Sequence, residues 1–433
     1  MNNKGLFATI LTFLFLLSSL SFGQSTSKPF VYGDLLPDAP ELAARGEYAV
    51  GVQTLDLIHE NQLDILNYGK GEDSLYNRPI KVEIWYPAEA GSEELISYDE
   101  VMGQNGSPTR PLIPFTFLGR ASRNAKAVYE DEPFPLVIVS HGYTGSRYLM
   151  TYLTENLASK GYVVVAIDHT EATFRDAAGF QSTLLNRSLD DLFVLNEMAR
   201  LSEDQESFLK GLVNAANTAL IGYSMGGYGA VNVAGGGYSP QAVQLFGGMT
   251  GGSKALQRRS VGNPEFEASI DPRIKVIVAF APWGMQRGVW NAEGLASIKI
   301  PSLFVAGSKD DISGYEDGTK AIYEGAVNSE RYLLTYIDAR HNTAPNPPPA
   351  EALEPGRPID EYLRYADSVW DMRRINNINQ HFVTAFLGFY LKGNDSYKGY
   401  LDVNANPDAK EWPGFKPRTT VGLELDHKTS LEN

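Results

Sequence analysis

The sequence predicts an α/β fold with a mainly parallel, doubly wound sheet and helices on both of its faces. Continuous apolar runs of strand length recur along the chain, as at residues 135–140 (PLVIVS). Such runs are typical of strands that are buried on both faces of a parallel sheet. Helical segments separate them, as at residues 147–160, an amphipathic stretch that is followed by Gly161. This alternation favours parallel strands joined by helical crossovers.

The expected elements follow in order along the chain. Residues 80–86 (IKVEIWY) are β-branched and aromatic and precede Pro87, which predicts a strand. Further strands are expected at 135–140, 162–167, 219–223, 274–280, 302–306 and 332–337. Helices are expected at 147–160, within 189–212 and at 372–391. The last of these carries an apolar stripe at helical spacing, made of Met372, Ile375, Ile378, Phe382, Phe386 and Phe389.

The chain of 433 residues is predicted to contain one catalytic domain with extensions at both ends. The expected parts are a signal peptide at 1–23, an N-terminal extension at 24–78, the domain at 79–391 and a C-terminal tail at 392–433. Insertions that interrupt the alternation are expected at about 91–132, 235–272 and 342–361. The last two follow predicted catalytic positions, so we expect them to overhang the site as loops or a cap.

The N-terminus has the pattern of a cleavable secretory signal peptide. Lys4 precedes an apolar run at 6–20, which is shorter than the ~20 residues that a membrane-spanning helix needs. Ser21 and Gly23 supply the small residues that precede a cleavage point. We therefore expect a secreted or periplasmic protein without a stable membrane anchor. The alternative is that the segment stays attached as an anchor.

Composition excludes several classes of function. Lys and Arg number 37 against 52 Asp and Glu, and the net charge of −15 disfavours binding to nucleic acid. The absence of cysteine excludes disulfides, thiolate metal sites and a cysteine nucleophile. With only six histidines, nothing in the sequence suggests a metal site or a cofactor.

The strongest motif is the pentapeptide Gly222-Tyr223-Ser224-Met225-Gly226, which has the pattern G-x-S-x-G. It follows a predicted buried strand and precedes a predicted helix, the setting of a nucleophile elbow. Such a turn holds the serine in a strained backbone conformation with its hydroxyl exposed. Glycines stand two residues to either side because side chains there would collide with their neighbours. The alternative interpretation is a glycine-rich turn with a solvated serine.

A serine nucleophile needs a base, usually a histidine that a carboxylate orients. Asp310 comes just after the strand at 302–306 and His341 just after the strand at 332–337. Both are placed at the carboxyl ends of parallel strands, where the ligand sites of such sheets form. The sequence thus predicts a triad of Ser224, His341 and Asp310, with Asp311 as the rival acid.

An oxyanion hole needs two backbone N–H donors. One is expected from Met225, which follows the nucleophile, and the other from Tyr143, in the loop after the strand at 135–140. The alternative for that loop is an ordinary turn. His141, His169 and His381 are expected in structural roles.

These motifs resemble those of a known group of proteins. Residues 80–88 (IKVEIWYPA), 140–147 (SHGYTGSR) and 222–227 (GYSMGG) are similar to α/β-hydrolases of the dienelactone-hydrolase-like and platelet-activating-factor-acetylhydrolase-like group. The tripeptides at 142–144 (GYT) and 281–283 (APW), with SMGG at 224–227, also resemble bacterial cutinases and polyester hydrolases. The resemblance covers roughly 79–391 and implies an α/β-hydrolase fold.

The same resemblance implies that Tyr143, Met225 and Trp283 line the acyl or aromatic side of a substrate cleft. Trp283 has an alternative as a core residue. The chain also departs from the pattern, because true dienelactone hydrolases use cysteine, and cutinase-type enzymes are shorter and commonly carry a disulfide. Long insertions leave open whether a polymer has access.

The expected function is that of a secreted serine hydrolase that cleaves carboxylic esters, with a preference for short acyl groups. The expected partner is a small-molecule ester, with a polyester as the larger possibility. The alternatives are acyl transfer or peptide hydrolysis on the same triad, and a non-catalytic exported binding module on a hydrolase scaffold.

Overall fold

The computed structural model describes residues 29–69, 75–89, 94–403 and 412–431. The predicted signal peptide lies outside these residues. The folded unit comprises Val31–Asn433. Among the described residues, no helix has the length and apolar character needed to cross a bilayer.

The strands are β1 (Ala49–Leu63), β2 (Leu75–Ala88), β3 (Ile96–Met102), β4 (Ile113–Gly119), β5 (Ser122–Arg123), β6 (Phe134–Ser140), β7 (Val163–Asp168), β8 (Val213–Tyr223), β9 (Ile274–Phe280), β10 (Ser302–Gly307), β11 (Arg331–Tyr336) and β12 (Leu423–Lys428). The helices are α1 (Thr151–Ser159), α2 (Phe180–Glu203), α3 (Met225–Val233), α4 (Pro240–Met249), α5 (Pro264–Ala268), α6 (Ala292–Ala296), α7 (Lys320–Gly325), α8 (Ile359–Leu363) and α9 (Met372–Tyr390). Short 3-10 or π-helical segments are η1 (Glu41–Ala43), η2 (Ala255–Arg259), η3 (Met285–Arg287), η4 (Tyr315–Thr319), η5 (Ala350–Leu353) and η6 (Asp395–Tyr400).

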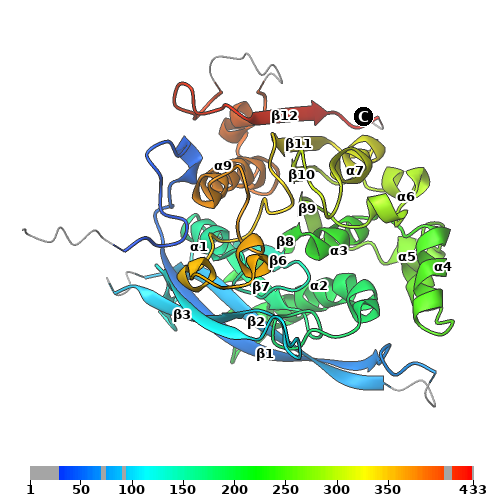
Figure 1. Cartoon of the computed structure of the whole chain (residues 1–433). Coiled ribbons are helices and arrows are strands. Elements are labelled where there is room, and N and C mark those ends of the chain that lie inside the picture. The colour runs from blue at the N-terminus through cyan, green and yellow to red at the C-terminus, as the bar shows by residue number, and fades with distance from the viewer. Residues whose placement is uncertain (1–28, 70–74, 90–93, 404–411, 432–433) are drawn as a thin grey trace, which may run out of the picture. The chain divides into compact units, whose positions relative to one another are not determined.

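In the described part of the chain, ten strands form one sheet in the order β12-β11-β10-β9-β8-β6-β7-β2-β1-β5 (Figure 1). The six central strands, from β11 to β7, run parallel. β2 and β1 continue the sheet antiparallel at one side, and β12 is antiparallel at the other. The prediction of a mainly parallel, doubly wound sheet is confirmed.

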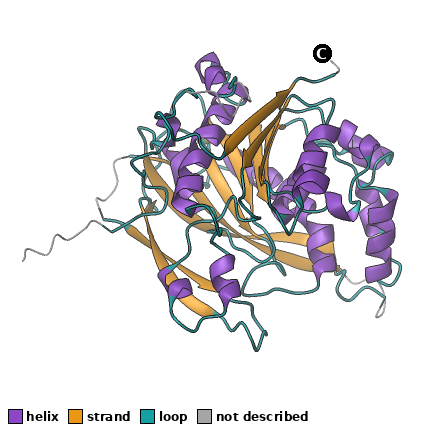
Figure 2. Cartoon of the chain, turned by 45° about the horizontal axis from the view of Figure 1, so that its top comes forward, coloured by secondary structure: helices purple, strands orange, loops and turns teal. Residues whose placement is uncertain are grey.

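The two faces of the sheet are covered by different helices (Figure 2). On β6, Val137 and Val139 belong to a core shared with α1 and α9, while Leu136 and Ile138 belong to a core shared with α2 and α3. Alternate side chains of a strand point to opposite faces. Successive residues of a central strand therefore belong to the two cores in turn. This explains why the central strands read as continuous apolar runs.

The chain changes direction across the sheet at β6. The connection through α1 leads to β7 on one side, and the connection through α2 returns to β8 on the other. The carboxyl ends of β6 and β8 therefore meet at a topological switch point, where ligand sites of open α/β sheets form. Ser140 of β6 is paired with Gly222 of β8 at this point.

Both predicted terminal regions contribute to the sheet, which corrects their description as an extension and a tail. β1 lies within 24–78 and pairs along its length with β2, and β12 lies within 392–433 and pairs with β11. The insertion predicted at 91–132 contains regular structure, because β3 and β4 form a two-stranded antiparallel sheet there. In β3, Tyr98 and Glu100 are buried while Ser97 and Asp99 are exposed. Because exposed polar residues alternate with buried ones in β3, this strand is not a continuous apolar run and cannot be recognised as one.

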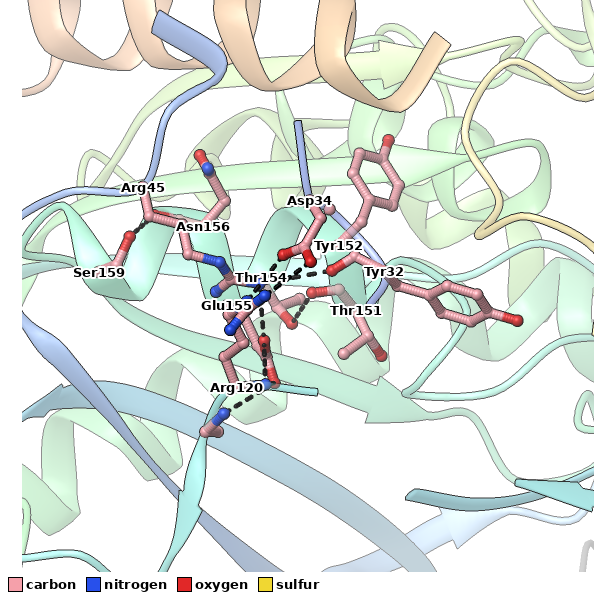
Figure 3. A network of polar contacts seen from close by, with 12 residues as sticks. Tyr32, Asp34, Arg45, Arg120, Thr151, Tyr152, Thr154, Glu155, Asn156 and Ser159 are labelled. Carbon is pink, nitrogen blue, oxygen red and sulfur yellow. Dashed lines mark hydrogen bonds and ion pairs between the residues drawn. The ribbon is translucent and has the colours of Figure 1, made fainter. Parts of the chain in front are cut away.

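One buried carboxylate, Glu155 of α1, helps to attach the segment before β1 to the core (Figure 3). Its oxygens accept hydrogen bonds from Arg45 Nη2 at 3.0 Å and from the Tyr98 hydroxyl at 2.9 Å. The backbone N–H groups of Arg120 and Ala121 also donate to it, at 2.9–3.1 Å. A single side chain thus joins the N-terminal segment, β3 and the chain after β4 to the layer of helices.

Candidate active site

The turn between β8 and α3 has the geometry that its glycines predict. Ser224 has φ 53° and ψ −109°, which is strained for a residue with a side chain. A Cβ atom on Gly222 would lie 2.1 Å from the carbonyl oxygen of Gly226, and one on Gly226 would lie 1.9 Å from that of Ser140. Only glycine fits at these two positions, so the chain can turn sharply and present the hydroxyl of Ser224.

The structure brings Ser224, His341 and Asp310 together. His341 Nε2 lies 3.0 Å from Ser224 Oγ, and His341 Nδ1 lies 3.0 Å from both carboxylate oxygens of Asp310. The Asp310 side chain is fully buried and that of His341 is 11% exposed. Asp310 Oδ1 also accepts the backbone N–H groups of Ile312 and Ser313, each at 2.9 Å. These bonds fix the carboxylate in the orientation that faces the imidazole.

The rival acid, Asp311, points elsewhere. Its carboxylate pairs with Arg340, whose Nε lies 3.1 Å from Oδ1 and whose Nη2 contacts Oδ2. Burial raises the pKa of Asp311, but the hydrogen bond and the charge of Arg340 outweigh it and lower the pKa overall. The two neighbouring aspartates therefore bind different partners: Asp310 contacts the imidazole of His341, and Asp311 pairs with Arg340.

The two segments that carry the predicted oxyanion donors adjoin Ser224. Met225 is the first residue of α3, and the first N–H groups of a helix have no intrahelical acceptor. Tyr143 follows Gly142, on which a Cβ atom would lie 3.2 Å from Ser224 Cβ. The Tyr143 hydroxyl donates to the Ala178 carbonyl at 2.9 Å, which anchors this loop. Both predicted oxyanion donors thus lie on segments that adjoin the serine.

Trp283 lies beside the elbow rather than in front of it. Its backbone N–H donates to the Ser224 carbonyl at 3.1 Å. Its half-buried ring packs edge-on against Phe180, with ring centroids 5.2 Å apart, and against Tyr228 at 6.3 Å. Phe180 in turn packs against Tyr143 at 5.4 Å. Trp283 therefore reaches the predicted oxyanion loop through Phe180.

Ser224 and His341 open into a cavity of about 460 Å³. Its lining includes Gly142 and Tyr143 together with residues from the predicted insertions at 91–132 and 342–361. The described residues that line it are Arg110, Gly142, Tyr143, Thr144, Leu149, Phe174, Tyr223, Ser224, Asp311, Ile312, Arg340, His341, Asn342, Asp360, Leu363, Arg364 and Ala366. Trp283 and the segment 235–272 are not among them.

Hydrogen bonds of Asn342 hold the chain after His341 beside the site. The Asn342 side chain accepts a hydrogen bond from the Tyr223 hydroxyl at 2.9 Å and donates to the carbonyls of Leu363 and Ala366. The elbow residue Tyr223 is thus connected to the segment that covers the cavity. Asn342, Arg110 and Arg364 could not be expected at the site from the sequence, because none of them belongs to a recognisable motif.

The other histidines near the elbow are buried beneath it. His169 Nε2 lies 2.8 Å from Ser140 Oγ and its Nδ1 lies 3.0 Å from Asp190. Burial lowers the pKa of His169 to about 3 and holds that of His141 well below its ordinary value. Both rings support the strand ends under the site. In the part of the chain that the structure describes, no three His, Cys, Asp or Glu side chains cluster as metal ligands would.

Comparison with known proteins relates this region to hydrolases. A family model described as PET hydrolase-like matches residues 130–244, which include Tyr143, Ser224 and Met225 but end before Asp310 and His341. Cutinase 2 of Thermobifida cellulosilytica is 24% identical over 219 residues, which are 51% of this chain and 64% of the relative. Cutinase cut1 of Thermobifida fusca is also 24% identical, over 51% of this chain and 53% of the relative.

The chain therefore spans between about half and two thirds of the length of these relatives. A ferulic acid esterase from Streptomyces cinnamoneus superposes with a TM-score of 0.52 at 21% identity, covering 82% of this chain and 94% of that one. This likeness concerns the fold.

Proposed function

The chain has the α/β-hydrolase fold with a PET hydrolase-like segment and is related in sequence to cutinases, and from this premise we propose that it is a serine hydrolase of carboxylic esters. The observation that carries the proposal is the hydrogen-bonded series from Ser224 Oγ through His341 to Asp310, with each contact at 3.0 Å. The strained elbow and the adjoining cavity support it further.

In the proposed mechanism, Ser224 Oγ attacks the ester carbonyl carbon while His341 Nε2 takes the hydroxyl proton. Asp310 keeps Nδ1 protonated, so that Nε2 is the basic nitrogen, and stabilises the imidazolium that forms. The N–H groups of Met225 and Tyr143 donate to the oxyanion. The imidazolium then protonates the leaving alcohol and an acyl-enzyme remains. Water, deprotonated by His341, attacks that acyl group and releases the acid.

We propose small, short-acyl esters as the substrates. The cavity is about 460 Å³, and the segment that Asn342 fastens forms part of its wall. Residues on a covering segment restrict the length of a substrate that reaches the serine. The proposed role of Trp283 in binding applies to a substrate that extends out of the cavity toward Phe180. Faster hydrolysis of an emulsified long-chain triglyceride than of a butyrate ester would contradict the preference.

We also propose that the protein acts outside the cytoplasm. The support is the apolar run at 6–20, with Ser21 and Gly23 before a cleavage point. N-terminal sequencing of the protein exported by its natural host is expected to begin at Gln24.

The triad is tested with a fluorophosphonate probe and a butyrate ester, on the wild type and the Ser224→Ala variant. We expect the variant to keep its melting temperature, to lose labelling and to lose nearly all turnover. The residual rate would exceed the uncatalysed rate by about 10³–10⁴, from the oxyanion hole and binding alone. Ser269→Ala is the matched control, because the hydroxyl of this exposed serine bonds, within the described part of the chain, only to the Phe266 carbonyl. Wild-type labelling that persists in Ser224→Ala would refute the assignment.

Product analysis distinguishes the other reactions of such a triad. Hydrolysis yields the free acid whether or not an acceptor alcohol is present, whereas an acyltransferase yields the new ester in aqueous buffer. A peptidase would cleave amide substrates at rates comparable with esters. A non-catalytic binding module would neither react with the probe nor turn over any substrate.

A further inference from the structure

The cavity in front of Ser224 is lined by three arginines, and two of them have anionic partners. Arg340 pairs with Asp311. Arg110 Nε donates to Glu361 Oε1 at 2.5 Å, and Glu361 is fully buried. The Nη2 atom of Arg110 is buried and has no hydrogen-bond partner among the described residues. Arg110 therefore keeps one unused donor beside the cavity.

The third arginine, Arg364, has no such partner. It follows α8 directly, and its guanidinium makes no hydrogen bond or ion pair within the described part of the chain. Burial, followed by the charge of Arg110, lowers the pKa of Arg364, and the charge of Glu361, the carboxylate that Arg110 binds, partly opposes this shift. Its positive charge also opposes the rise that burial causes in the pKa of the Tyr143 and Tyr223 hydroxyls. Arg364 thus lies close to the oxyanion loop and to the elbow.

The remaining charge on the wall is Asp360, which is exposed. It makes no ion pair with Arg364 within 4.0 Å, and water screens an exposed carboxylate strongly. An arginine that is half-buried without a partner has lost part of its hydration. An anionic ligand group would restore the lost interactions, and the unused donor of Arg110 would add to them.

We propose, on the basis of the proposed ester hydrolase function, that the substrate carries a carboxylate besides its scissile ester and that Arg364 binds this carboxylate, with Arg110 beside it. A planar guanidinium matches a carboxylate with two parallel hydrogen bonds, which a neutral polyester chain cannot supply. The substrate class is then an ester that carries a free carboxylate: either a dicarboxylic acid esterified at one end, or an ester whose alcohol part bears the acid. The carboxylate fixes one end of the molecule, so that the ester at the other end reaches Ser224.

The test compares matched pairs of esters. Mono-4-nitrophenyl glutarate against 4-nitrophenyl butyrate places the carboxylate on the acyl side, and 4-acetoxybenzoate against phenyl acetate places it on the alcohol side. In the pair whose carboxylate reaches Arg364, the wild type is expected to have a higher kcat/KM for the anionic ester than for its neutral counterpart. Charge-assisted bidentate bonds imply that Arg364→Gln reduces kcat/KM for that ester by about 10- to 100-fold, while the neutral ester changes less than about threefold.

Matched variants separate binding from general electrostatics. Arg357→Gln removes a positive charge from the same segment, but this residue pairs with Glu354 and does not line the cavity. It is expected to leave the preference unchanged. Arg364→Lys should recover part of the preference, because a single ammonium keeps the charge without the planar fork. Asp360→Asn should raise the preference by about twofold, since it removes the repelling carboxylate.

A binding measurement keeps this proposal independent of turnover. Titration calorimetry of monomethyl glutarate with Ser224→Ala is expected to show binding that disappears in the double variant Ser224→Ala/Arg364→Gln. Binding of this kind without hydrolysis of any ester would refute the ester hydrolase function and leave the carboxylate site intact. Equal kcat/KM for charged and neutral esters, or an equal loss for both in Arg364→Gln, would overturn the carboxylate site while the hydrolase function stands.

Discussion

Asp310 and His341 share two contacts of 3.0 Å, because both oxygens of the carboxylate lie at the same distance from Nδ1 of the imidazole. The neighbouring Asp311 turns to Arg340 instead. This division arises from the turn after β10, where Asp310 Oδ1 also accepts the N–H groups of Ile312 and Ser313. The two aspartates, adjacent in sequence, are therefore expected to differ sharply when they are replaced.

Asp310→Asn is expected to reduce kcat by about 10⁴, the loss seen when the orienting carboxylate of a comparable triad becomes an amide. The amide presents a donor to Nδ1 and favours the tautomer whose Nε2 carries the proton, which cannot act as a base. Asp311→Asn is the matched control and is expected to change kcat only a few-fold, because it loses an exposed ion pair. Steady-state kinetics on a butyrate ester decide between them. The reverse order of effects would assign the orienting role to Asp311.

The glycines of the elbow allow a second comparison. In Gly222→Ala the new methyl group would meet the Gly226 carbonyl oxygen at 2.1 Å, so the backbone must move and carry Ser224 with it. We expect this variant to lose most of its activity and more than about 2 kcal/mol of stability. Gly248→Ala is the control, since nothing lies within 4 Å of a Cβ atom there and the residue is in α4. It is expected to stabilise by about 0.5–1 kcal/mol. Urea unfolding and ester turnover measure both effects, and similar results for the two glycines would contradict the packing argument.

The network around Glu155 predicts a stability effect far from the chemistry. Glu155→Gln replaces an acceptor of backbone N–H groups with an amide that brings its own donor, and it leaves Arg45 without its anion. The expected loss is about 3 kcal/mol of unfolding free energy. Glu130→Gln is the control, because this exposed side chain accepts only from the Tyr48 hydroxyl, and its effect should stay within about 0.5 kcal/mol. A denaturation curve for Glu155→Gln that overlays the wild type would disprove the role of this carboxylate.

How far the sequence predicts the molecule depends on how local each signal is. The central strands are apolar runs, and the elbow is encoded by glycines at fixed offsets from Ser224, so both can be recognised in one chain. Asp310 could be predicted to lie beside His341, because both residues follow the carboxyl ends of predicted parallel strands. β1 escaped recognition because much of it is polar and only half-buried, and it gains its place by pairing with β2.

Arg110 and Arg364 could not be recognised as site residues from the sequence, for a different reason. Arg110 lies in the chain between β3 and β4, and Arg364 follows α8, so only the folded chain brings them to one cavity. An arginine on a polar or proline-rich segment resembles any surface cation in the sequence. What distinguishes Arg364 is that it is half-buried and has no hydrogen-bond or ion-pair partner among the residues that the structure describes.

The last prediction concerns the pH dependence of stability and His381 of α9. The ring is fully buried, and Nδ1 accepts the Leu42 N–H at 3.2 Å, which requires an unprotonated nitrogen. Burial, followed by the charge of Lys160, lowers the pKa of His381 to about 3. In the unfolded chain a histidine takes up its proton near pH ~6.5. Between these values the unfolded state binds more protons than the folded state, so stability falls as the pH falls from about 6.5 toward 3.

One such histidine contributes a slope of up to about 1.4 kcal/mol per pH unit. His169 adds to the slope with the same sign, since its pKa is also lowered to about 3. His381→Asn supplies an oxygen to the Leu42 N–H and removes one titrating group. Its unfolding free energy, measured in urea at pH 7.0, 5.5 and 4.5, should therefore fall less steeply as the pH falls than that of the wild type. The difference between the two slopes corresponds to the uptake of up to about one proton on unfolding. The absolute stability of the variant is expected to be lower at pH 7, because the ring packs against Phe382 and Phe415. Equal slopes for the two proteins would mean that His381 is protonated in the folded state.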